Sequence, residues 1–299
     1  MRFAAKIPMR AAVSGLSLTV RSVVVMLLCA VAFAAGRQSD AAPARKAAPD
    51  REPFLPGETL LYKVDWDPPW FLFFLPKMEA GRLELGVEES PPYEGKAAWK
   101  VRFRAYSSGT LASLTGVNVD DTFESVADPA TLCTYSVSKQ VREGKKKRDI
   151  KVRYEPEQSR LHILETDVAK APPVITKDRF KENVPPCVMD IFAALYALRR
   201  EQLVLGTSKR WILGDDDVVK EVETRVLKSE VVMGPAGPTN SLHVETVSLL
   251  GGLFKDGGQF RIWLSNDDRR VPLKFQVQVK LGKVDGRLVS AEPGRGARK

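Results

Sequence analysis

Histidine and cysteine are scarce in this 299-residue chain, which has two of the former and three of the latter. Few imidazoles and thiols leave little material for a catalytic triad or a zinc site, and three cysteines cannot build a dense disulfide scaffold. The sequence also lacks the motifs G-x-S-x-G and H-E-x-x-H, a Walker loop and a C-x-x-C pair. We therefore expect a protein that is not an enzyme and holds no cofactor or metal.

The remaining polar candidates have simple interpretations. His162 and His243 each stand between two apolar residues of an alternating segment, so each is expected to point from a strand into solvent. The acidic run Asp215, Asp216 and Asp217 lacks the spacing of a calcium-binding loop, although oxygen-rich clusters of this kind do bind calcium. We expect a solvated hairpin turn there.

Positive charge is concentrated at the two ends of the chain. The net charge is +9, of which residues 1–50 carry +5 and residues 291–299 carry +2. Residues 51–290 are therefore nearly neutral, at +2. A nucleic-acid-binding protein would be expected to carry a basic surface on its folded part, so nucleic acid is not expected as a partner.

The N-terminus has the order of an export signal. Basic residues precede an apolar stretch, Ser22–Ala35, that ends in small residues. Its 14 residues fall short of the roughly 20 that span a bilayer, so we expect a cleaved signal over residues 1–36, with an uncleaved anchor as the alternative. Cys29 sits in a poor lipidation context. Residues 37–53 read as a flexible linker and residues 291–299 as a loose tail, and the expected location is the periplasm or the cell envelope.

Alternation of apolar and polar residues dominates the mature chain and predicts a single β-rich domain over residues 54–290. Turn-forming residues separate the alternating segments, as in an all-β sandwich or barrel. The predicted strands are Thr59–Trp66, Gly81–Glu88, Ala98–Tyr106, Asp121–Val126, Thr134–Val141, Lys147–Tyr154, Leu161–Thr166, Lys209–Leu213, Val218–Val232, Ser241–Leu249, Gln259–Leu264, Pro272–Val279 and Val284–Ser290.

One segment has a helical period. Val188–Glu201 is rich in Ala and Leu, follows two prolines and offers Asp190 as an acid at its start. Arg199 and Arg200 would complement the helix dipole in its last turn. The expected apolar face consists of Ile191, Ala194, Leu195 and Leu198.

Two cysteines remain if the signal is cleaved, Cys133 and Cys187. In an oxidising compartment they can form one disulfide, which would close a loop of about 55 residues and contribute about 4 kcal/mol in the chain-entropy account. Two separate buried thiols are the alternative, and spacing alone does not decide between them.

Six segments, taken in order, carry a resemblance to a known family. They are PFLPGETLLYKVDW (53–66), AGRLELGV (80–87), VDDTFESVADPATL (119–132), REGKKKRDIKVRY (142–154), DIFAALYALR (190–199) and GGQFRIWLSNDDRRVPLKFQVQVKLGKVDGRLV (257–289). In this order the chain resembles the bacterial exported-protein family catalogued as domain of unknown function 3108, and WLSNDDRRVP (263–272) is the most specific piece. The resemblance implies an all-β fold with one central helix, in which a strongly curved antiparallel sheet forms a half-barrel or barrel-like sandwich. It carries over no catalytic residues.

An apolar loop is the point at which the chain departs from this family's pattern, which usually has a short turn between the first two strands. Here the turn holds Trp70, Phe71, Leu72, Phe73 and Phe74 between prolines. These residues are candidates for ligand or membrane contact. The 70–75 loop is too short to cross a bilayer. Three alternatives remain open: an inward cap on the core, an exposed patch against a membrane or partner, and a gate of an apolar cavity.

A basic run lies in a predicted turn and offers a possible anion contact through Lys145, Lys146, Lys147 and Arg148. Such a run can meet lipid phosphates, or it can be an ordinary soluble hairpin tip. No aromatic residue interleaves with it, so it provides no stacking surface for nucleic acid.

These observations favour a non-enzymatic periplasmic or envelope protein that binds an apolar or amphiphilic envelope component through a curved sheet. The alternative is a structural or assembly protein that packs on an envelope protein, and a hydrolase comes a distant third. Contact with a membrane, if there is any, is expected through the N-terminal segment or the 70–75 loop.

Overall fold

A computed structural model describes residues 52–72, 74–116, 118–247, 260–279 and 282–295. Within these ranges the chain forms one antiparallel sheet of fourteen strands with a few short helices. The strands are β1 Glu58–Asp67, β2 Met78–Tyr93, β3 Lys96–Ser107, β4 Asp120–Ala127, β5 Thr134–Glu143, β6 Lys146–Glu155, β7 Arg160–Asp167, β8 Val174–Glu182, β9 Ser208–Asp215, β10 Val218–Gly234, β11 Gly237–Val247, β12 Phe260–Ser265, β13 Pro272–Val279 and β14 Gly282–Glu292. The helices are η1 Trp70–Leu72, α2 Gly109–Thr115, η2 Pro156–Gln158 and α3 Ile191–Arg200.

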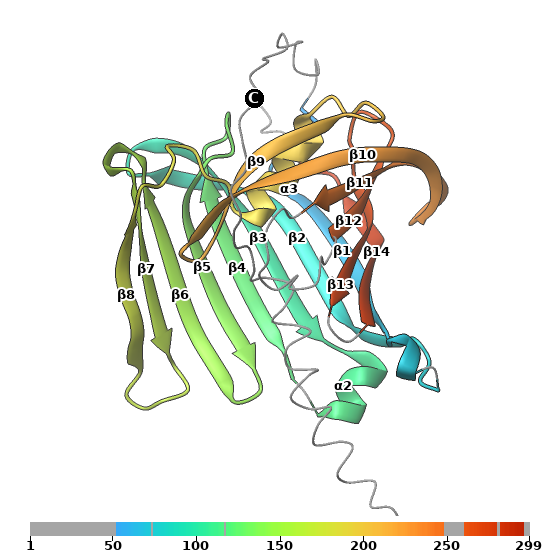
Figure 1. Ribbon diagram of the computed structural model, residues 1–299, viewed down its shortest axis with the longest axis horizontal. Coiled ribbons are helices and arrows are strands. Elements are labelled where there is room, and N and C mark those ends of the chain that lie inside the picture. Colours follow the sequence, from blue (N-terminus) through green and yellow to red (C-terminus); the bar gives the residue numbers. More distant parts are fainter. Residues whose placement is uncertain (1–51, 73, 117, 248–259, 280–281, 296–299) are drawn as a thin grey trace, which may run out of the picture.

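The first and last strands meet in the middle of the sheet. β1 pairs with β14, consecutive strands β2 to β8 extend from β1 on one side, and β13 to β9 extend from β14 on the other. The edges, β8 and β9, are the two strands that α3 connects, and the sheet is not closed between them. Figure 1 shows the strong curvature of the sheet. The predicted all-β class with one central helix is confirmed in this curved antiparallel sheet.

Helix α3 lies inside the curve of the sheet, near the end where β9 and β10 lie. It contacts β3 and β4 on one side and β9 on the other (Figure 1). Phe192 stacks on Phe103, with ring centroids 4.5 Å apart, and lies 6.3 Å from Phe123. The inward residues of the strands form the buried cluster against which the helix packs. The alternation seen in the sequence is therefore the inward and outward alternation of this sheet.

The ends of α3 are fixed by its flanking residues, but its buried face differs from the expected one. Asp190 caps the helix and accepts hydrogen bonds from the backbone nitrogens of Phe192 and Ala193, as its position in the sequence predicted. Ile191, expected on the apolar face, is 43% exposed. The buried helix residues are Ala193, Tyr196, Ala197, Leu198 and Arg199.

Strand β8 was not predicted from the sequence. Most of its residues are exposed on both faces because it is an edge strand with little packed against it. Alternation arises only where one face is buried, so the pattern is absent here. All thirteen predicted strands correspond to observed ones, although the ends of two of them, Ser248–Leu249 and Gln259, lie outside the described residues.

The predicted export signal, Cys29 and most of the linker lie outside the described residues. The last linker residues do belong to the packed structure, since Pro53 is buried and Glu52 forms an ion pair with Arg200. Among the described residues there is no helix with the length and apolarity needed to span a membrane.

Candidate functional site

The apolar loop forms an exposed aromatic tip, defined here as Trp70, Phe71 and Phe74, at the end of the β1–β2 hairpin. Two prolines stop β1, and the short helix η1 follows. Trp70 is 87% exposed, Phe74 67% and Phe71 49%. The rings of Trp70 and Phe71 meet edge to face at 6.0 Å, so these two exposed side chains form one apolar patch.

The base of the tip is held against the protein. Leu72 and Leu75 pack against the hydrophobic core, and a backbone hydrogen bond joins Leu75 to Leu72. Lys77, two residues after Leu75, forms an ion pair with Asp285 of β14. The inward-cap alternative is therefore wrong for Trp70, Phe71 and Phe74, which are exposed, while Phe73 lies outside the described residues. Of the three alternatives, the structure favours the exposed patch.

The basic run extends from the β5–β6 turn, which holds Lys145, into the first residues of β6, and its four residues separate into two groups. Lys145, Lys146 and Lys147 are exposed. Arg148 is only partly exposed and forms an ion pair with Glu165 of β7 at 2.7 Å. Arg148 is thus a structural side chain of the concave face, and the candidate anion contact reduces to the three lysines.

Two buried carboxylates underlie this turn. Asp121 accepts a hydrogen bond from the backbone nitrogen of Arg142, and Glu143 lies 3.5 Å from Lys146. Burial raises the pKa of Glu143 to about 7, against the opposing effect of Lys146, and nearby Asp121 raises it further. Burial also raises the pKa of Asp121. This end of the β4–β5 pair therefore carries less negative charge than its sequence suggests.

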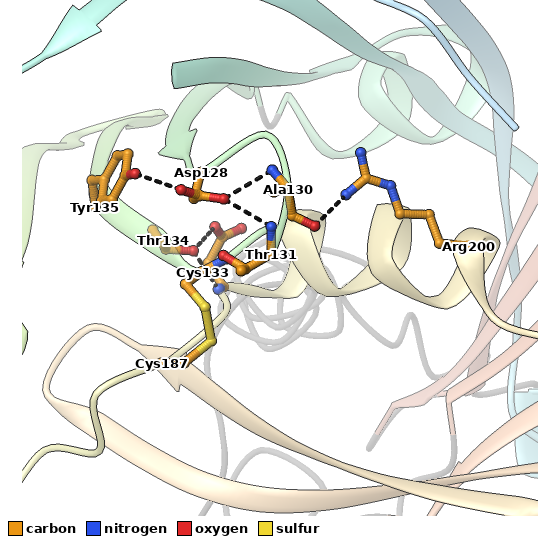
Figure 2. Close-up of a disulfide and its surroundings, with 9 residues drawn as sticks. Asp128, Ala130, Thr131, Cys133, Thr134, Tyr135, Cys187 and Arg200 are labelled. Carbon is orange, nitrogen blue, oxygen red and sulfur yellow. Dashed lines mark hydrogen bonds between the residues drawn. A yellow bond between two sulfur atoms is a disulfide. The ribbon is translucent and has the colours of Figure 1, made fainter. Parts of the chain in front are cut away.

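A disulfide joins Cys133 and Cys187. Of the two alternatives left open by the sequence, one disulfide or two separate buried thiols, the structure has the disulfide. Figure 2 shows the bridge between the turn that follows β4 and the segment that leads into α3. In that turn Asp128 accepts hydrogen bonds from the backbone nitrogens of Ala130 and Thr131. Arg200, at the far end of α3, donates to the carbonyl of Ala130. The bridge and these hydrogen bonds fasten α3 to the sheet.

The acidic run is not a solvated turn, contrary to the prediction. Asp215 and Asp216 both pair with Lys139 of β5, whose side chain is 9% exposed. Asp217 pairs with Lys177 and Arg179 of β8. The β9–β10 hairpin therefore bends over the concave face and is fastened there by cations, which occupy the carboxylates that a metal would need.

A buried ion pair closes the other end of α3. The guanidinium of Arg199 donates to both carboxylate oxygens of Glu58, at 2.5 and 2.9 Å, and each side chain is 1% exposed. Arg199 also donates to the carbonyl of Arg269 and stacks over Phe54 and Tyr196. Its role is therefore not dipole complementation alone. Three segments that carry the family resemblance converge at this ion pair.

The two histidines differ in environment. His162 is partly exposed and lies 2.7 Å from Asp178, close to the prediction. His243 is 7% exposed and stacks on Trp263 at 4.4 Å, so the expectation that it faces solvent is wrong. Burial lowers the pKa of His243, although Glu230 opposes this shift.

An open groove of about 490 Å³ crosses the outer face of β4 to β7. Apolar surface from residues such as Val126 and Leu164 lines it together with the charged side chains of Glu124, Lys151 and Arg153. Small ligands are usually held in cavities that enclose most of their surface, and this groove is open to solvent, so we place it second to the aromatic tip as a contact for an acyl chain.

Known proteins resemble the chain mainly in fold. A β-barrel-like protein of domain of unknown function DUF1849 from Brucella abortus superposes with a TM-score of 0.52 at 12% identity, over 79% of this chain and 97% of that one. A putative exported protein with a YmcC-like fold from Bacteroides fragilis gives a TM-score of 0.33 at 8% identity, over 80% of this chain and 97% of that one. No curated protein matches the chain. The family model described as protein of unknown function (DUF3108) matches residues 61–289, and the chain therefore belongs to this family.

Proposed function

We propose that this protein is a non-enzymatic component of the bacterial envelope that binds an apolar or amphiphilic envelope component, with the aromatic tip as its contact. The single observation that carries the proposal is the exposure of Trp70, Phe71 and Phe74 on a tip whose base is packed into the core. Large aromatic side chains in water are unfavourable, and clusters of them mark surfaces that are covered in the working state of a protein.

The composition of the tip fits a lipid interface. Indole and phenyl rings favour the boundary between headgroups and acyl chains, and tryptophan is especially enriched there. Export of the chain, expected from its N-terminal sequence, would place the tip where envelope lipids are available. The curved sheet then serves as the scaffold that presents the tip.

Tryptophan fluorescence provides a direct test. Of the five tryptophans, Trp66, Trp211 and Trp263 are buried and Trp99 is partly buried, so Trp70 is the exposed reporter. Adding lipid vesicles should shift emission to shorter wavelength and allow quenching by lipids brominated on their acyl chains. The variant Trp70→Phe should lose the change in emission. If vesicles neither shift nor quench the emission of Trp70, the proposal is refuted.

A matched control tests whether the effect is specific to the tip. Val231 and Met233 on β10 are 62% and 65% exposed, comparable with Phe74. Replacing Phe71 and Phe74 by Ser should weaken vesicle binding, whereas Val231→Ser with Met233→Ser should not. Equal losses in both pairs would indicate nonspecific adhesion.

The edge strand β8 favours a second candidate, packing on a protein partner of the envelope. Among the described residues it pairs with a strand on one side only, and it exposes Val174, Ile175 and Phe180 by 41%, 60% and 46%. Unpaired edges of this kind accept an added strand from another chain. Replacing Ile175 by Lys should abolish stoichiometric co-purification of such a partner, and its persistence would exclude this edge as the contact.

A further inference from the structure

The aromatic tip lies at the same end of the sheet as the β5–β6 turn with Lys145, Lys146 and Lys147, which we call the lysine turn. β1, β3 and β5 run in one direction, because each neighbouring pair from β1 to β5 is antiparallel. The tip follows the end of β1 and the lysine turn follows the end of β5. Four strand spacings of about 4.8 Å separate them by roughly 19 Å along the sheet. Figure 1 shows the aromatic tip and the lysine turn at the end of the sheet that carries α2, away from the end where β9 and β10 lie.

A further exposed cation lies beside the tip. β14 begins at this end, and its register places Lys283 opposite Asp67, three residues before Trp70. Lys283 is exposed, as are Lys145 and Lys147, and none of these three lysines forms an ion pair within the ranges that the structure describes. We refer to Lys145, Lys147 and Lys283 as the free lysines.

Most carboxylates of this end are occupied or buried, and the partly exposed Asp67, opposite Lys283, is an exception. Asp120 pairs with Arg104, Asp167 with Lys170 and Asp285 with Lys77. The carboxyl of Glu143 is buried beneath the lysine turn. Although residues 51–290 carry only +2 in total, the three free lysines outnumber Asp67, so the surface around the tip is locally cationic. Such a surface attracts anionic headgroups and opposes contact with a cationic partner.

We propose that this end of the sheet docks on an anionic bilayer surface, with the aromatic tip in the interfacial layer and the free lysines at the level of the lipid headgroups. The inference rests on the proposed function and adds its lipid class and the orientation of the protein. One weak apolar contact rarely holds a protein on a membrane, and a second, electrostatic contact stabilises such binding. A surface of aromatic and basic residues provides both the apolar and the electrostatic contact.

The test compares vesicles of phosphatidylcholine with vesicles that contain about 30% phosphatidylglycerol. The full chain is expressed in a bacterial host and purified from its envelope, and quenching of Trp70 by brominated acyl chains reports contact at the tip. We expect anionic vesicles to bind at least tenfold more tightly, and Lys145→Gln, Lys147→Gln and Lys283→Gln together to weaken binding about a hundredfold, at about fivefold for each lysine. High salt should remove the preference for anionic vesicles.

Three exposed lysines elsewhere provide the matched control. Lys96, Lys151 and Lys228 are exposed and lie away from the tip, and their joint change to Gln alters the net charge equally. This control should bind anionic vesicles nearly as well as the parent chain. An equal loss would show a general effect of charge and overturn the docking orientation. Far-ultraviolet circular dichroism of each variant checks that the fold is intact.

The outcomes separate the two proposals. Quenching of Trp70 that is equal on neutral and anionic vesicles, and unaffected by the three changes to Gln, would overturn the anionic docking surface and leave the proposed function standing. The absence of Trp70 quenching on either vesicle would overturn both. A protein that crosslinks stoichiometrically at position 70 in envelope extracts, with no quenching by lipid, would replace the bilayer as the occupant of this surface.

Discussion

Breaking the buried ion pair between Arg199 and Glu58 should strongly destabilise the fold. Replacing Arg199 by Met removes two charged hydrogen bonds, at 2.5 and 2.9 Å, from a carboxylate that is 1% exposed. Removing one partner of such a pair leaves an uncompensated buried charge and costs about 3–5 kcal/mol. Arg269, whose guanidinium lies 3.6 Å from Glu58, can offset part of this, so we expect about 3 kcal/mol.

The double variant isolates the cause. Replacing Glu58 by Leu together with Arg199→Met removes both charges, and apolar replacement of a buried pair is often close to neutral. The double variant should therefore be more stable than the single Arg199→Met variant, within about 2 kcal/mol of the parent chain. Urea denaturation followed by circular dichroism measures the free energy of unfolding of each variant.

An exposed ion pair of similar geometry serves as the control. Arg104 makes two hydrogen bonds to Asp120, at 2.9 and 3.1 Å, and the two side chains are 42% and 50% exposed. Arg104→Met should cost less than about 1 kcal/mol, since water screens such pairs. If Arg199→Met cost no more than Arg104→Met, or if the double variant were less stable than the single one, the reasoning from burial would be refuted.

Three further predictions concern the disulfide, the helix cap and the buried carboxylates. Reducing the bridge between Cys133 and Cys187, 54 residues apart, should lower the free energy of unfolding by about 4 kcal/mol, measured by urea denaturation with and without dithiothreitol. Asp190→Ala should cost about 2 kcal/mol or more, because it leaves two helix nitrogens and the buried hydroxyls of Ser125 and Thr134 without their acceptor; a loss below about 0.5 kcal/mol would contradict this. The pKa of Glu143 is raised by burial to about 7, so the folded state holds a proton that the unfolded state releases above its usual pKa near 4.5. Its contribution to stability is thus greatest below pH 4.5 and is lost as the pH rises to about 7, and Glu143→Gln should flatten this part of the stability profile measured by denaturation at each pH.

The sheet could be predicted because its inward face is continuous. Every strand with one buried face shows alternation in the sequence, and the exception, β8, has little buried on either face. The helix was visible from its period and from Asp190, which caps it. Its buried face was misjudged because Arg199 looks like a surface residue in the sequence, while its partner Glu58 lies 141 residues away.

The candidate site was harder to predict, because its properties depend on distant residues. Asp217 pairs with Lys177, 40 residues earlier, so nothing near the acidic run indicates that its charge is neutralised. Six consecutive apolar residues suggest burial, and only the position of the hairpin shows that the tip extends into solvent. Lys283 was missed because it joins the tip through the β1–β14 pairing, which sequence order does not reveal.

The pairing of β1 with β14 also determines where this chain could be cut and rejoined. Gly294 packs against the backbone of Leu55, so the two ends of the described domain lie side by side in the centre of the sheet. A circularly permuted chain, with these ends linked and new termini at the β2–β3 turn near Gly95, would keep the same strand order. Shortening the chain from either end would instead remove a central strand and split the sheet into two halves.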